Sequence, residues 1–269
     1  MPRFSANLRY LFQEYPLYDR FSAAADMGFK AVEYQFPYGE DVSKLQTVLD
    51  KHGLEIVLIN ALPGDYAAGD SDLADIVERE AEFKETIEDA IFYSTTLNCP
   101  RIHIIAGVLK AHFAHEVALS VLSENLKYAS DLCAEAGIKV LTEPLNTIDV
   151  PWYLIGHTIQ ARNLMAIINS ENLFLQYDLY HCGMNGENLE DSIKSNLNVT
   201  DYIQVAGVLG RAEPDIGDID FKKSLKFGYD WISRMGGVCI YAPNAYVRRN
   251  EMGFRLWNWK PISNCIKQN

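Results

Sequence analysis

The chain of 269 residues is 48% hydrophobic and 22% charged, so it can bury a large core and suits one large α/β domain or two small ones. Its formal net charge of -12 and sequence pI near 4.9 disfavour nucleic acid or an anionic membrane surface as a partner, because both reward clustered Lys and Arg. Five cysteines without a CxxC pair predict reduced thiols. No targeting segment is readable, and no apolar run approaches the ~20 residues of a membrane span, so we expect a cytoplasmic protein.

Apolar segments with the character of β-strands recur along the chain and alternate with helical segments. In chain order, the predicted strands cover residues 4–8, 31–34, 54–60, 101–106, 138–143, 173–178, 202–206 and 238–241. Such alternation predicts parallel strands that are joined by crossover helices.

The clearest predicted helix covers about 117–136, where apolar residues recur every three or four positions on one face. Gly137 follows it, as a helix C-terminus prefers. Gly28 and Gly53 follow the predicted helices "FSAAADM" and "KLQTVLDKH" in the same way, each just before the next strand. The pattern of a helix, a glycine and then a strand therefore repeats along the chain.

This repeat decides the expected fold. No Pro/Gly/Ser-rich linker interrupts it, so we expect one domain over residues 1–269. Eight strand-helix units in a chain of this length fit a (β/α)8 TIM barrel, and a doubly wound open sheet is the second choice. In a barrel of this kind the active site lies at the C-terminal ends of the strands, so the last residue of each strand is the place to look.

The predicted strand ends are mostly polar, although the strands themselves are apolar. They carry Asn7, Glu33, Asn60, His103, Glu143, Asp178 and Gln204. Glu143, Asp178 and Gln204 together would offer an all-oxygen ligand set, which suits Mg²⁺ or Mn²⁺. His103 and His181 nearby would instead favour Mn²⁺ or Zn²⁺.

Each of these residues also has a structural explanation. A polar residue at a strand end is as often a loop-facing side chain as a functional one. His181, between Tyr180 and Cys182, is as often packed and hydrogen-bonded as it is a ligand. The chain has no GxGxxG or GxxxxGKS pattern, no GxSxG elbow and no cysteine with a placed partner, so we expect neither nucleotide binding nor covalent catalysis.

Longer motifs match a known family in order and spacing. They include "FSANLRYLF", "AVEYQFPY", "RIHIIAG", "TEPLN", "DVPWY", "QYDLYH" and "IQVAGVLGRAEPDIGDIDF". With these motifs, from about Phe4 to Trp257, the chain resembles the hydroxypyruvate isomerase family. That family belongs to the xylose isomerase-like TIM-barrel superfamily, which also includes the 2-oxo-tetronate isomerases.

The resemblance implies a (β/α)8 barrel with one divalent metal, and an aldose-ketose isomerisation of a small hydroxy-carbonyl acid, such as hydroxypyruvate to tartronate semialdehyde. In the family a Glu, an Asp, a Gln and a second Glu hold the metal, and the glutamates also carry the proton. The first three positions match Glu143, Asp178 and Gln204 here. Arg211 matches the arginine expected near the substrate carboxylate, and His103 and Glu33 match positions that line the pocket. Self-association into a homo-oligomer stays open.

The chain departs from the family pattern at two positions. Counted without a gap, the second family glutamate falls on Ile240, which can neither bind a metal nor move a proton. Ala212 stands where relatives have histidine after the arginine. Two classes therefore stay open: an isomerase of small hydroxy-carbonyl acids, and a catalytically impaired relative that binds a metal or a small carboxylate ligand. A metal-dependent endonuclease of the same superfamily is disfavoured by the acidic charge and by the few histidines at ligand spacing.

Overall fold

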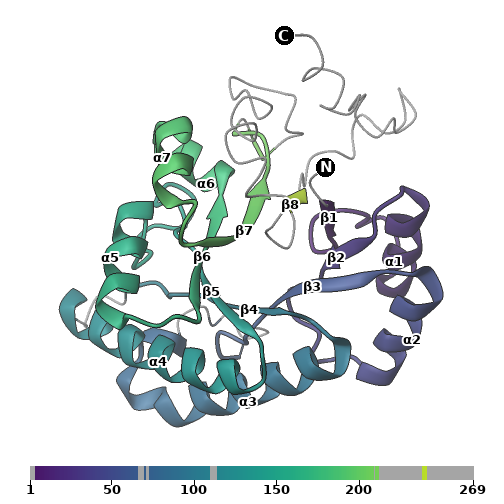
Figure 1. Ribbon diagram of the computed structural model, residues 1–269, viewed down its shortest axis with the longest axis horizontal. Coiled ribbons are helices and arrows are strands. Elements are labelled where there is room, and N and C mark those ends of the chain that lie inside the picture. Colours follow the sequence, from purple (N-terminus) through teal and green to yellow (C-terminus); the bar gives the residue numbers. More distant parts are fainter. Residues whose placement is uncertain are drawn as a thin grey trace.

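The strands of the computed structural model form a closed parallel barrel in which each strand pairs with its neighbours in chain order (Figure 1). The structure describes residues 4–65, 70, 73–109, 114–208, 210–211 and 238–240. The strands within these ranges are Phe4–Asn7 (β1), Ala31–Glu33 (β2), Glu55–Asn60 (β3), Arg101–Ile104 (β4), Lys139–Thr142 (β5), Leu173–Asp178 (β6), Thr200–Val205 (β7) and Val238–Ile240 (β8).

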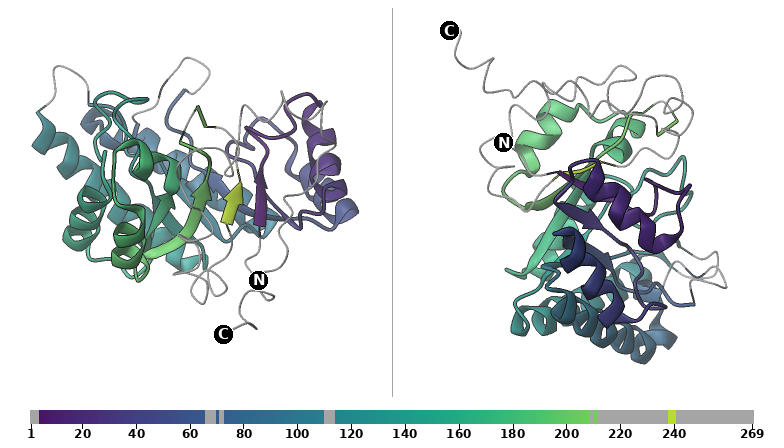
Figure 2. Two further views of the ribbon diagram at one scale, coloured as in Figure 1. Left: turned by 90° about the horizontal axis from the view of Figure 1, so that it is seen from above. Right: turned by 90° about the vertical axis from the view of Figure 1, so that its right-hand side faces the viewer.

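The longer helices lie outside the ring of strands in every view (Figures 1 and 2). The described helices are Leu17–Asp26 (α1), Val42–His52 (α2), Glu80–Leu97 (α3), His115–Glu135 (α4), Thr158–Ile168 (α5), Leu179–Met184 (α6) and Leu189–Asn196 (α7), with the short 3-10 helices Leu73–Asp75 (η2) and Val77–Arg79 (η3). Within the described part of the chain, α3, α4 and α5 contact strands β3 to β6 and so cover that part of the outer face of the barrel.

Helix α2 shows how the repeated unit forms. The Asp41 side chain accepts hydrogen bonds from the backbone of Ser43 and Lys44 and so caps the helix start. Leu45 and Leu49 are buried on one face of α2. Gly53 then takes a left-handed conformation with φ of 60°, which ends the helix before β3.

The barrel expected from the sequence is confirmed, and the open doubly wound sheet is excluded because β1 pairs with β8. The boundaries of two elements differ slightly from the predicted ones. The long helix runs over His115–Glu135 instead of 117–136, and β5 ends at Thr142, one residue before Glu143.

The barrel interior is filled below the candidate site. Tyr202 lies two residues before Gln204 on β7, so both side chains point to the same face of the strand. The Tyr202 hydroxyl lies 2.7 Å from Ser5 Oγ across the barrel, and Tyr202 packs in a buried cluster with Leu58 and Leu141. This layer closes the interior and supports the polar strand ends above it.

Two further observations concern the helices and the cysteines. Among the described helices, none is long and apolar enough to cross a membrane. Of the cysteines whose side chains the structure describes, Cys99, Cys133 and Cys182 are free and buried.

Candidate active site

A cavity of about 210 Å³ lies at the C-terminal ends of the strands. Its lining includes seven of the nine candidate residues named from the sequence, namely Asn60, His103, Glu143, Asp178, His181, Gln204 and Arg211. The register of the barrel brings them together, because Asp178 on β6 pairs with Gln204 on β7 and Glu143 follows β5 directly. The volume lies below the ~300–1,000 Å³ of pockets for drug-sized ligands, which indicates a small ligand.

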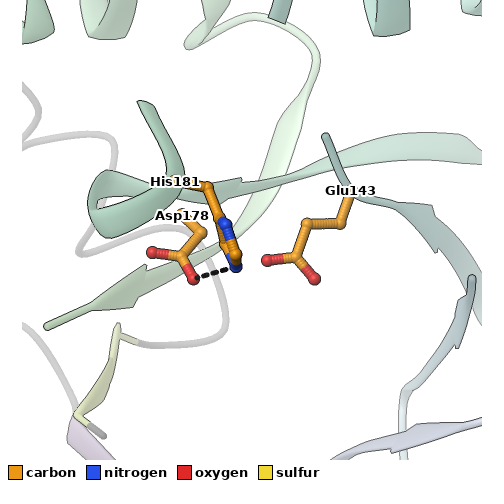
Figure 3. A group of neighbouring side chains, drawn as sticks. All are labelled: Glu143, Asp178 and His181. Atoms are coloured by element: carbon orange, nitrogen blue, oxygen red, sulfur yellow. Dashed lines mark ion pairs between the residues drawn. The ribbon is translucent and has the colours of Figure 1, made fainter. Parts of the chain in front are cut away.

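Glu143, Asp178 and His181 form a compact group at the floor of this cavity (Figure 3). Each offers one ligand atom, and these atoms lie within 4.8 Å of one another. Asp178 also caps the short helix α6, since its carboxylate accepts from the backbone of Tyr180. That helix places His181 beside the site, three residues after Asp178.

The floor concentrates negative charge in a buried place. Glu33, Glu143 and Asp178 are at most 5% exposed. Burial, and next the charges of Asp178 and Glu33, raise the pKa of Glu143 well above its ordinary value. Buried like charges at this spacing are costly unless a cation compensates them. The residues of this site therefore fit a bound metal ion.

Gln204 is oriented by the residues behind it. Its Nε2 donates to both carboxylate oxygens of Glu33, at 3.0 and 2.9 Å, and Glu33 also accepts from Asn7 Nδ2 at 2.6 Å. Because the amide nitrogen faces Glu33, the amide oxygen of Gln204 faces the other way, where it accepts from Gln176 Nε2 at 2.9 Å. The lining of the cavity does not include Glu33. Its predicted contact with a substrate stays a prediction, whereas its contact with Gln204 is observed.

Gln176 is a polar residue of the site that the sequence reasoning missed. Its Nε2 donates to Glu143 Oε2 at 2.7 Å and to Gln204 Oε1 at 2.9 Å. A signal was present: Gln176 stands two residues before Asp178 in an otherwise apolar strand, so it points to the same face.

Both ring nitrogens of His181 face hydrogen-bond donors. Its Nδ1 accepts from the backbone N–H of Asn146 at 3.1 Å and lies 2.8 Å from Asn146 Nδ2. Its Nε2 lies 2.8 Å from Arg211 Nη2, which can only donate, and 3.7 Å from Asp178 Oδ2. Burial lowers the pKa of His181 to about 4, so the ring is neutral near pH 7. His181 therefore adds no charge to the site and lies close enough to Glu143 and Asp178 to be a third metal ligand.

His103 faces Glu143 from β4. Its Nε2 lies 3.7 Å from Glu143 Oε2 and has no hydrogen-bond partner among the described residues. Burial lowers the pKa of His103 to about 3, so the ring is neutral near pH 7. The side chain thus offers a polar atom to the cavity without adding charge.

Arg211 lies above the floor, between two aromatic rings. Its Cζ is 5.5 Å from the Tyr10 ring centroid and 4.5 Å from that of Tyr180. Its Nη2, which can only donate, lies 2.8 Å from His181 Nε2. Arg211 has φ of 54°, a left-handed conformation that is unfavourable for a residue with a Cβ and is common at functional sites.

The rim carries further groups that were not predicted. Arg9 is exposed and lines the cavity, with its Cζ 6.0 Å from the Tyr10 ring centroid and 5.9 Å from that of Phe36. Asp149 also lines the cavity and accepts from Tyr180 Oη at 2.5 Å. The rim thus brings two guanidinium groups to the same tyrosine ring.

The structure describes the backbone of Ile240, whereas Ala212 lies outside the described residues. The backbone of Ile240 pairs with Val205 and Ala6, one position beyond the pair of Gln204 and Cys239. The Ile240 side chain and the whole of Ala212 lie outside the described residues. The proposed consequences of both departures stay predictions.

Comparison with known proteins identifies the class. The model of the xylose isomerase-like TIM barrel family matches residues 21–227. The chain is 38% identical to the 2-oxo-tetronate isomerase of Cupriavidus necator, over 91% of this chain and 94% of the relative, and 37% identical to the hydroxypyruvate isomerase of Escherichia coli, over 95% and 98%. The solved structure of a protein named AP endonuclease, family 2, from Brucella melitensis aligns with a TM-score of 0.87 and 36% identity, over 91% of this chain and 95% of that one.

The fold and the relatives thus identify an isomerase barrel, and its grouped acidic side chains suggest a metal site. The chain belongs to the xylose isomerase-like TIM barrel family and, within it, to the group of hydroxypyruvate and 2-oxo-tetronate isomerases. The resemblance seen in the sequence motifs is thereby confirmed.

Proposed function

We propose that the chain is a metal-dependent isomerase of small hydroxy-carbonyl acids, which converts hydroxypyruvate to tartronate semialdehyde or acts on a related 2-oxo acid such as 2-oxo-tetronate. The observation that carries this proposal is the convergence of buried Glu143 and Asp178 on a small cavity whose rim holds Arg211. Residues 1–269 would act as one barrel domain, in the cytoplasm.

Glu143, Asp178 and Gln204 would hold the metal through oxygen atoms. Two carboxylates and an amide oxygen suit Mg²⁺ or Mn²⁺, and a His181 nitrogen close enough to join them would favour Mn²⁺. A bound divalent ion supplies positive charge that stabilises an enediolate.

The protein itself must move a proton between two carbons. The isomerisation removes a proton from the carbon that bears the hydroxyl group and returns one to the neighbouring carbonyl carbon, while the hydroxyl proton passes between the two oxygens. Glu143 is the carboxylate that lines the cavity at the end of β5, and it would take and return the carbon-bound proton. His181, which lines the same cavity, would contact the substrate beside Glu143.

The arginines favour an acid over a neutral sugar. The Arg211 guanidinium offers a planar set of donors that matches a carboxylate, and its stacking on Tyr180 and Tyr10 holds it in place. Arg9 adds a second cation at the same rim. A substrate would thus place its carboxylate at the rim and its hydroxy-carbonyl end at the acidic floor.

Endonuclease activity, which the Brucella melitensis protein carries in its name, is disfavoured for this chain. Binding to a DNA backbone depends on clustered cations, and the chain carries a net charge of -12. The small cavity also points to a small ligand.

Turnover with defined metals tests the proposal. The purified, metal-stripped protein would be incubated with hydroxypyruvate or 2-oxo-tetronate in the presence of Mg²⁺, Mn²⁺ or excess chelator, and the product would be followed by NMR. We expect turnover with metal and its loss with chelator. Equal turnover in chelator, or no turnover of either acid with any of these metals, would contradict the proposal.

A second candidate function follows from Ile240. If β8 supplies no second glutamate, the chain could bind a metal and a carboxylate ligand with little catalysis, since losing a general base costs ~10²- to 10⁴-fold. Ile240→Glu should then raise the isomerase rate without a large change in the affinity for the acid. No gain in this variant would mean that another residue is the base or that the substrate is different.

A further inference from the structure

Gln176 lies at the centre of the hydrogen bonds beneath the candidate metal site. It is 2% exposed, and its strand β6 also supplies Asp178, two residues further on. Its hydrogen bonds to described residues go to Glu143 and Gln204, and the lining of the cavity does not include it. A role for Gln176 must therefore act through its neighbours.

A chain of directed hydrogen bonds fixes the orientation of the Gln176 amide. Glu33 can only accept, so Gln204 turns its nitrogen to Glu33 and its oxygen to Gln176. Gln176 must then present its own nitrogen, and that same nitrogen donates to Glu143 Oε2. The orientation of each amide thus follows from the one before, beginning at a buried carboxylate.

The cost of this arrangement indicates a function. Gln176 Oε1 is buried and has no hydrogen-bond partner among the described residues. A buried acceptor without a partner is unfavourable, and an apolar side chain of similar size would avoid that cost. The Gln176 amide nitrogen, however, donates two hydrogen bonds and so links Glu143 to Gln204.

We infer that Gln176 is a positioning residue that holds the oxygens of Glu143 and Gln204 at the spacing and orientation needed to bind the metal. This inference rests on the proposed function, because it concerns the same metal site. Partners that orient metal ligands in this way typically contribute 10- to 100-fold to metal affinity.

Titration of the metal-stripped protein with Mn²⁺ alone, followed by calorimetry, tests this role. Gln176→Met keeps the approximate length of the side chain and removes both donors, so we expect its Mn²⁺ affinity to fall about 10- to 100-fold. At saturating Mn²⁺ the rate of hydroxypyruvate turnover should return close to that of wild type, because the variant weakens metal binding and leaves Glu143 in place. Ser5→Ala is the matched control: it removes a buried polar contact to Tyr202 in the layer below and should leave Mn²⁺ affinity unchanged.

The outcomes separate the inference from the proposed function. If the wild-type chain binds neither Mn²⁺ nor Mg²⁺, the proposed metal site fails and the role of Gln176 fails with it. If the wild-type chain binds Mn²⁺ and folded Gln176→Met binds it equally well, only the inference is overturned. Should Gln176→Met fail to fold, Gln176→Asn, which keeps the amide but withdraws it by one methylene, decides between the same two results.

Discussion

The floor and the rim of the cavity are built in different ways. Glu143, Asp178 and Gln204 at the floor stand at strand ends and are at most 5% exposed. Arg9 and Arg211 at the rim belong to the segments that follow β1 and β7, and their guanidinium groups lie against aromatic rings. The floor is thus set by strand register, and the rim by packing between loops.

We expect the floor to carry out the chemical step and the rim to recognise the acid. The floor concentrates carboxylates that a metal can compensate and a proton carrier can use, whereas the rim offers cations that match an acid. Variants of the floor should change metal binding and the rate of the chemical step. Variants of the rim should change the apparent affinity for the acid and leave the metal unaffected.

The largest effect is expected at the floor, from Glu143→Ala. This variant removes a candidate ligand and the proposed proton carrier together, so we expect metal binding to be lost in calorimetry and kcat to fall by ~10²- to 10⁴-fold. Glu171→Ala is the control, because it removes an exposed carboxylate before β6, away from the C-terminal strand ends. Unchanged metal affinity in Glu143→Ala would disprove the assignment of the site.

The floor was predictable because a parallel barrel gives a rule for where to look. Glu143, Asp178 and Gln204 follow from strand ends, and the regular pairing of neighbouring strands brings them together. Gln176 obeys the same geometry one layer lower. Gln176 was not predicted because the rule of strand ends considers only the last residue of each strand, and Gln176 stands two residues earlier in "LFLQYD".

The rim was less predictable because loop conformations are not periodic. Arg211 was found only through the family motif, and its left-handed backbone and its place between two tyrosines are tertiary features. Arg9 was not predicted. The contact of His181 with Asn146 joins residues 35 positions apart in the chain, and such a contact has no local signal.

Arg211→Met should give the largest effect at the rim. Hydrogen bonds between charged groups contribute about 1.5–3 kcal/mol, so the KM for hydroxypyruvate should rise about 10- to 100-fold while the Mn²⁺ affinity stays near that of wild type. Steady-state kinetics together with calorimetry would check both. The neutral analogue dihydroxyacetone, which has a hydroxymethyl group in place of the carboxylate, should be affected much less. Equal losses for the acid and the neutral analogue would remove the distinction between rim and floor.

A stability measurement tests the floor without any substrate. Because the folded state raises the pKa of Glu143, its ionisation opposes folding: the stability of the protonated form is present below the unfolded value of about 4.3 and is lost as pH rises through the raised pKa. In metal-free protein at pH 7, Glu143→Gln should therefore raise the Tm, by about 2 °C or more. The difference from wild type should shrink toward pH 4. A lower Tm in metal-free Glu143→Gln at pH 7 would show that the carboxylate is already compensated within the protein.

Arg9→Met should give the smallest effect, because Arg9 is exposed and its charge is screened. An exposed ion pair contributes about 0.2–1 kcal/mol, so we expect kcat/KM for hydroxypyruvate to fall about two- to fivefold. The loss should be greatest at low ionic strength and should fade as salt is added, since salt screens the attraction between the rim and an anion. Lys30→Met makes the same change in net charge at an exposed residue just before β2, the opposite end of that strand from Glu33, and should not alter the salt dependence. If Lys30→Met and Arg9→Met behave alike, the overall charge of the protein attracts the acid, and the rim has no special part in choosing it.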